Sequence, residues 1–105
     1  MRITVSHNKP KQELMRAVDQ SFDDLFRGIG VFPLQIVNEK RAWNGSVLNF
    51  SFDAKVGFLN TPIKGIVEVT DRDITIDADL GLLEKLFPAK QTSTAIEGRV
   101  RGLLK

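Results

Sequence analysis

The chain has 105 residues, a length typical of one domain. Hydrophobic residues make up 42% of it and charged residues 27%, which argues against a disordered chain. It contains no cysteine, so disulfides, thiolate metal sites and thiol catalysis are excluded. The net charge is only +2 and the basic residues are scattered, which argues against nucleic-acid binding. With short apolar runs and no signal-peptide hydrophobic region, residues 1–105 are expected to form one cytoplasmic domain without a transmembrane segment.

The first predicted elements are a short strand and a long helix. Residues 3–6 form a β-type run, and Pro10 suits the first turn of a helix whose capping residue is Asn8 or Lys9. From residue 11 to 27 the apolar side chains recur every three or four positions, which predicts one amphipathic helix of about five turns. The two glycines that follow are expected to end this helix.

An Asn-Gly pair predicts a turn between a strand over residues 34–43 and a strand over residues 46–54. A two-residue turn would place Arg41 opposite Leu48, whereas a four-residue loop would place Trp43 opposite Leu48. We expect the longer loop, because the strand register usually follows the buried face.

The next hairpin has the clearest pattern. With Asp71 and Arg72 as its turn, one face of both strands becomes wholly apolar, and a slip of one residue would destroy the match. The apolar pairs expected in this register are Val69–Ile74, Val67–Ile76, Gly65–Ala78 and Ile63–Leu80. On the other face, Ile66 is expected opposite Asp77 and Lys64 opposite Asp79.

Residues 82–87 form a short apolar connector, and residues 90–104 predict a final amphipathic helix. The expected order is therefore β-α-β-β-β-β-α. A sheet with one apolar face and two helices with one apolar stripe each predict a two-layer α+β domain. Its antiparallel sheet carries both helices on the same face. The other sheet face is left to water or to a partner.

Few residues are candidates for chemistry. His7, the sole histidine, follows the first strand at a place where side chains can face a cleft. A capping or hydrogen-bonding histidine is the better interpretation, because no serine nucleophile or orienting aspartate stands at a recognisable spacing. The aspartates at positions 73, 77 and 79 share one strand face, which indicates a solvated surface rather than a cation site. Gly28 and Gly30 lack the third glycine of a dinucleotide-binding motif. Taken together, these patterns predict no metal site, no cofactor site and no catalytic residue.

Two apolar groups are candidates for binding. One would line a ligand pocket beneath the helices, although ordinary core is the simpler interpretation for so small a domain. It consists of Trp43, Leu48, Phe50 and Phe52. The other would form an exposed apolar patch of the kind that marks interfaces, with core burial an equal alternative. It consists of Phe58 and Leu59 in a loop, Ile66 on the open sheet face, and Leu82, Leu86 and Phe87 in the connector.

The chain resembles a family of small bacterial proteins of the polyhydroxyalkanoic acid system, named for the granule region. The likeness covers nearly the whole chain. Its most specific parts are the string W-N-G-S-V-L-N-F at residues 43–50 and the string L-G-L-L at residues 80–83. It also rests on Val5-Ser6-His7 after the leading strand and on the strand sequences at residues 65–69 and 74–76.

This resemblance implies an accessory or binding protein without catalytic activity, associated with polyester storage granules or granule proteins. It brings no catalytic residue with it. The element order also resembles a shortened helix-grip, or START-like, fold, which implies the alternative of a small carrier for an apolar ligand. That likeness is at the level of the fold and assigns no ligand.

A homodimer is also expected. The open sheet face is mostly polar, so packing two sheets together there would bury carboxylates away from water. The contact should instead use a strand edge or the connector at residues 82–87. Because the first strand is only about four residues long and a poor template, the connector, with Leu86 and Phe87, is favoured.

Overall fold

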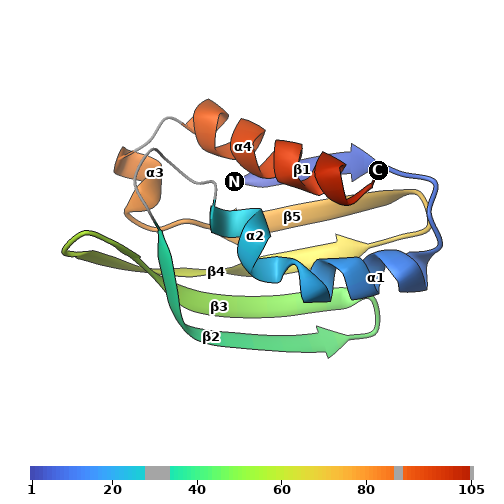
Figure 1. Ribbon diagram of the computed structural model, residues 1–105, viewed down its shortest axis with the longest axis horizontal. Helices are drawn as coiled ribbons and strands as arrows, with labels where there is room; N and C mark the ends of the chain where they lie inside the picture. The colour runs from blue at the N-terminus through green and yellow to red at the C-terminus, as the bar shows by residue number, and fades with distance from the viewer. Residues whose placement is uncertain (28–33, 87–88, 105) are drawn as a thin grey trace.

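The computed structural model describes residues 1–27, 34–86 and 89–104, and within them five strands and four helices form two layers (Figure 1). The elements are β1 (Arg2–Ser6), α1 (Lys11–Gln20), α2 (Phe22–Arg27), β2 (Gln35–Asn44), β3 (Val47–Val56), β4 (Leu59–Val69), β5 (Asp73–Asp79), α3 (Leu83–Leu86) and α4 (Ala89–Leu103). The strands lie in the order β1-β5-β4-β3-β2, and every neighbouring pair is antiparallel. The predicted two-layer α+β fold is confirmed.

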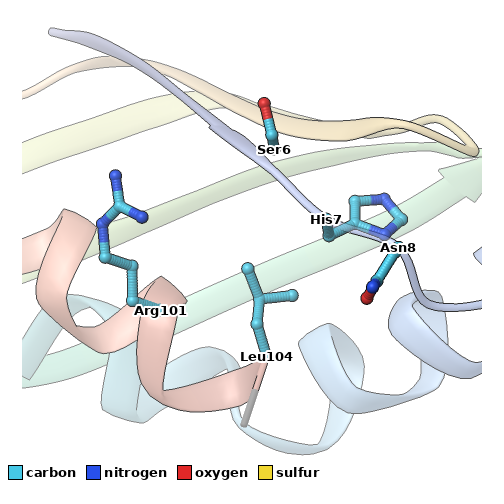
Figure 2. Close-up of a pocket in the computed structure, with 5 residues that line it drawn as sticks. All are labelled: Ser6, His7, Asn8, Arg101 and Leu104. Atoms are coloured by element: carbon cyan, nitrogen blue, oxygen red, sulfur yellow. The ribbon is translucent and has the colours of Figure 1, made fainter.

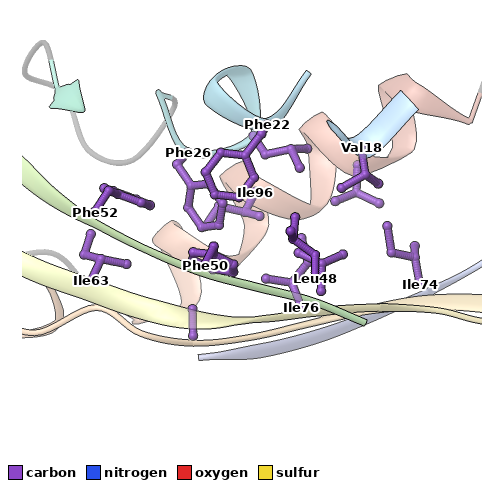
Figure 3. Close-up of a cluster of buried hydrophobic side chains, with 14 of the residues drawn as sticks. Val18, Phe22, Phe26, Leu48, Phe50, Phe52, Ile63, Ile74, Ile76 and Ile96 are labelled. Atoms are coloured by element: carbon purple, nitrogen blue, oxygen red, sulfur yellow. The ribbon is translucent and has the colours of Figure 1, made fainter. Parts of the chain in front are cut away.

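The core lies between the sheet and the helices, which cover a single sheet face (Figure 3). Its side chains alternate along β3, β4 and β5 with polar side chains that point to the open face. The helical layer contributes Leu14, Val18, Phe22 and Phe26 from α1 and α2, and Ile96 and Val100 from α4. In the part of the chain that the structure describes, these side chains form one cluster.

The predicted register of β4 and β5 is confirmed from the Val69–Ile74 pair to the Lys64–Asp79 pair. The predicted Ile63–Leu80 pair is wrong, because β5 ends at Asp79 and the chain turns away to begin α3. Leu80 is nevertheless buried in the core. The hydrophobic pattern therefore predicted burial one residue beyond the end of the ladder.

Trp43 does lie opposite Leu48, as predicted, but the expected four-residue loop is wrong. Asn44 pairs with Val47, so only Gly45 and Ser46 form the turn. Gly45 has φ 62°, which suits a two-residue hairpin turn. The ladder thus extends one pair further than the sequence suggested.

The expected continuous helix over residues 11–27 is wrong, because the helix breaks at Ser21. This residue has φ −110° and ψ 17°, outside the helical region, and its N–H donates to the carbonyl oxygen of Ala17. The break leaves the Asp19 carbonyl free to accept a hydrogen bond of 2.6 Å from Arg41 Nη1. It also lets α2 run separately, with Phe22, Leu25 and Phe26 all buried.

The two ends of the helical layer also differ from expectation. Pro10, not Asn8 or Lys9, occupies the N-cap position of α1, and no side chain caps that end. The glycines expected to end α2 lie outside the described residues. The segment predicted only as an apolar connector contains the short helix α3, which the sequence pattern did not predict. Among the described helices, none is both long and apolar enough to span a bilayer.

Truncating Phe22 to alanine should lower the free energy of unfolding by about 3–5 kcal/mol, because its buried ring contacts three others. The same substitution at Phe58, whose residue surface is 97% exposed, should change it by less than about 0.5 kcal/mol. Guanidinium unfolding followed by circular dichroism measures both. Equal losses from the two variants would contradict this account of the core.

Candidate functional site

Both ring nitrogens of His7 are used in hydrogen bonds within the protein. Nδ1 accepts the backbone N–H of Lys9 at 3.0 Å, and Nε2 lies 2.8 Å from the carbonyl oxygen of Thr70. Because Nδ1 is an acceptor, the proton of the neutral ring is on Nε2 and is donated to Thr70. The backbone N–H of His7 also bonds to the carbonyl oxygen of Arg72 at 2.8 Å.

His7 therefore ties the β1–α1 connection to the turn between β4 and β5. Because both nitrogens have partners within the protein, the ring has no lone pair available to act as a general base. This geometry agrees with the hydrogen-bonding interpretation of His7 rather than the catalytic one.

A hollow of about 570 Å³ lies beside this connection, and Figure 2 shows the residues that line it. Arg101 and Leu104, at the end of α4, face Ser6, His7 and Asn8 at the end of β1. Arg101 also pairs with Glu97 one turn earlier, at 3.2 Å. Its described lining residues offer a guanidinium group and an apolar side chain, and both ring nitrogens of the histidine among them are already hydrogen-bonded.

Three of the four side chains proposed to line an internal ligand pocket are packed as core. Leu48, Phe50 and Phe52 are at most 4% exposed. The rings of Phe50 and Phe52 contact those of Phe22 and Phe26, with centroids 5.1–6.1 Å apart. These side chains occupy the space in which a ligand was expected, so a bound ligand would have to separate them.

The fourth residue, Trp43, lies half-buried on β2 beside a polar cluster that sequence reasoning missed. Its Nε1–H donates to Asp19 Oδ1 at 3.1 Å, and Arg41 stacks on the ring of Phe22, 5.0 Å from the centroid. Arg41 also lies 3.6 Å from Glu39. This cluster joins β2 to the break between α1 and α2. The alternation along β2 places Arg41 and Trp43 on the helix-facing side. The sequence could have indicated this face, but the charge of Arg41 argued against it.

The carboxyl group of Glu39 has a pKa raised above its ordinary value. Burial is the main cause, a hydrogen bond to Asp23 adds to it, and the positive charge of Arg41 opposes it. The ionised form of Glu39 therefore costs stability in the folded state. Where β2 carries Glu39, the strand pairing shifts between Val37 and Lys40.

The structure divides the expected apolar patch. Phe58 lies in the two-residue turn between β3 and β4, while Leu59 begins β4 instead of lying in a loop. Ile66 lies eight residues from Phe58, about 26 Å along an extended strand, between Asn49 and Asp77 on the open face. A single patch containing Phe58 and Ile66 is therefore wrong. The side chain of Leu86 and all of Phe87 lie outside what the structure describes.

Leu82, 45% exposed, does lie at the same end of the sheet as Phe58. Its N–H donates to Thr61 Oγ1 at 3.0 Å, which fastens the start of α3 to the first residues of β4. Gly81 permits this approach, since a Cβ there would collide with Thr61 and its φ of 57° disfavours other residues. In Figure 1, α3 and the β3–β4 turn lie at one end of the molecule.

The aspartates of β5 have ordinary surface partners. Asp73 accepts a hydrogen bond from Thr70 Oγ1 at 3.0 Å, and Asp77 lies 3.7 Å from Arg2. Across the described residues, no group of three or more histidine, aspartate or glutamate side chains is placed to hold a metal ion.

Both strings that carry the family resemblance have structural roles. Residues 43–50 form the β2–β3 hairpin and its turn, with Leu48 and Phe50 in the core. Residues 80–83 join β5 to α3, with Leu80 and Leu83 buried. No protein-family model matches the chain, and a search of curated proteins finds no match either.

Replacing His7 with alanine should cost about 1–3 kcal/mol of stability, because Lys9 N–H and the Thr70 carbonyl both lose a partner. Nitrogen chemical shifts of the wild-type imidazole at neutral pH should show the proton on Nε2. A proton on Nδ1, or an alanine variant as stable as the wild type, would contradict the hydrogen-bonding role.

Replacing Glu39 with glutamine should raise stability at pH 7, by less than about 1 kcal/mol. The folded-state pKa lies above the unfolded one, so the penalty of ionised Glu39 grows as the pH rises through the folded-state pKa. The difference between the two proteins should therefore vanish below the ordinary pKa of 4.5. Thermal melts from pH 3 to 8 test this, with Glu68→Gln on the open face as the control for loss of one carboxylate. A gain that persists at pH 3 would refute the assignment.

Proposed function

We propose that this protein is a non-enzymatic binding protein that attaches to an apolar surface through the turn between β3 and β4. The observation that carries the proposal is the 97% exposure of Phe58, at the end of a hairpin and away from the core. Phe58 and the exposed Leu82 lie at the same end of the sheet, and apolar side chains exposed together favour a role in contact with another surface.

The turn holds Phe58 in a defined place. Val56 pairs with Leu59, and Gly57 supplies the φ of 62° that a two-residue turn needs. Behind the ring, Val56 is partly buried against the core and Leu59 is partly exposed. We call residues 56–59 the hairpin tip. The exposed Leu82 adds one more apolar side chain at the same end of the sheet.

Transfer of one phenylalanine from water into an apolar medium is worth about 2–3 kcal/mol, a change in affinity of about 30- to 150-fold. One ring alone thus gives weak, reversible attachment. Exposed lysines at positions 55 and 85, beside the tip and on α3, add attraction to a surface with negative charge.

The resemblance to the polyhydroxyalkanoic acid system family favours the polyester granule as this surface. Phospholipid vesicles present a similar combination of apolar interior and polar boundary, so they are the necessary comparison. The alternative of a carrier with an internal ligand draws no support from the packed rings of Phe50 and Phe52.

Phe58→Ser should reduce binding to purified polyhydroxybutyrate particles at least tenfold in a sedimentation assay. Phe58→Leu should keep most of the binding, because it preserves an apolar side chain. Lys64→Glu, an exposed change in the middle of the open sheet face, is the matched control for surface alteration and should bind like the wild type.

A Phe58→Trp variant gives a second readout. Its emission should shift to shorter wavelength on particles as the indole leaves water, relative to the wild type with Trp43 alone. Equal binding by Phe58→Ser and wild type would overturn the proposal. Binding to phosphatidylglycerol vesicles but not to polyester would reject the granule as the surface.

A further inference from the structure

One edge of the sheet, formed by β1, presents unpaired backbone groups. Met1 and Ala78 exchange backbone hydrogen bonds, and at the other end of the strand His7 donates to Arg72. Antiparallel pairing alternates, so Ile3 and Val5 also bond to β5. The N–H and C=O groups of the residues between them point away from the sheet. These residues are Arg2, Thr4 and Ser6.

The opposite edge, β2, is protected against strand addition. Its pairing shifts between Val37 and Lys40, and Asn38 has φ 56° there. Asn38 is held in place by a hydrogen bond of 2.8 Å to Asp53. Such a bulge with neighbouring charges is a common protection of edge strands. The described part of β1 has neither a bulge nor a proline.

A hollow lies at each end of the β1 edge, and α4 lines both of them. The hollow of about 570 Å³ lies between Ser6 and Arg101, and a second of about 220 Å³ includes Arg2 and Lys90. Helix α4 packs against β1 and crosses in front of it along its length (Figure 1). We call the two hollows and the edge of β1 between them the edge groove.

The lining of the edge groove carries more positive than negative charge. Arg2, Lys90, Arg101 and the amino group of Met1 belong to it, whereas Glu84 is the single acidic side chain among the described lining residues. Two of these cations have acidic neighbours outside the lining, since Arg2 lies 3.7 Å from Asp77 and Arg101 lies 3.2 Å from Glu97, which leaves Lys90 as the side chain with no ion pair among the described residues. Glu84 already lies 3.5 Å from the amino group of Met1. Acidic side chains on a ligand would therefore increase its affinity for the groove.

We propose that the edge groove binds an extended acidic peptide segment of a partner protein as a sixth, antiparallel strand. Three residues of β1 with two outward groups each provide six backbone hydrogen-bonding groups, enough to pair a segment of about five residues. Alternate side chains of the peptide lie toward α4, where Arg101 and Lys90 contact its carboxylates.

A second copy of the chain fits this edge poorly. Two β1 strands related by a two-fold axis would lie about 4.8 Å apart, each with its own α4 on the same face. Packed helices need about 8–10 Å between their axes, so the two α4 helices would collide. An extended segment without a helix above it has no such conflict.

The test uses a blocked hexapeptide of alternating glutamate and valine, labelled for fluorescence anisotropy. The expected Kd is about 100 µM, because the contact is small. Thr4→Pro should weaken binding about tenfold, since it removes an outward N–H without touching the ladder to β5. Thr4→Val keeps the N–H and, like wild type, should bind. Arg101→Glu should weaken binding several-fold at low salt.

Amide hydrogen exchange separates this mode from other contacts. Saturating peptide should slow exchange at Thr4 and Ser6, whereas Ile3 and Val5 are protected with or without it. A hexapeptide N-methylated at alternate residues tests the same bonds from the ligand side, even if Thr4→Pro does not fold. Unchanged exchange at Thr4 and Ser6, or undiminished binding of the methylated peptide, would overturn the proposal. Equal binding of a lysine–valine hexapeptide would overturn its acidic specificity.

Discussion

Contact among four phenylalanine rings holds the helical layer to the sheet. Phe22 and Phe26 come from α2, Phe50 and Phe52 come from β3, and each ring touches the other three. Tilted and edge-on ring pairs of this kind add specific geometry to the burial of apolar surface. The arrangement needs α2 to leave the line of α1, which explains why the helix breaks at Ser21. It also fills the interior with packed side chains, so that both proposed binding surfaces lie at the margins of the sheet.

The sequence predicted those parts of the fold in which any other arrangement would expose apolar side chains to water. A slip of one residue between β4 and β5 would turn either Val67 or Ile76 toward water, so their pairing could be predicted. The break at Ser21 could not, because the apolar spacing continues through it and gives no sign of a change in direction. The hydrogen bond from Arg41 to Asp19 that accompanies the break joins two residues that lie 22 positions apart.

The candidate sites depended still more on long-range contacts. The role of His7 is set by Thr70, 63 residues away, and no local pattern indicates that partner. Phe58 and Ile66 were grouped because both are apolar outside the core, yet the length of β4 keeps them apart. The edge position of β1 follows from its pairing with β5, the last of the described strands along the chain, and hence from topology rather than from its own sequence.

The bulge in β2 limits the number of partner chains that can pair with the edges of the sheet. A sheet with two usable edges can add strands at both and grow into a polymer, which is a route to aggregation. Here the shift between Val37 and Lys40 interrupts one edge, and the α4 helices would collide if a second folded copy paired with the other edge through β1. Any complex formed at the sheet edge should therefore stop at one-to-one stoichiometry, and pairing of sheet edges should not link the molecules on a crowded surface into a polymer.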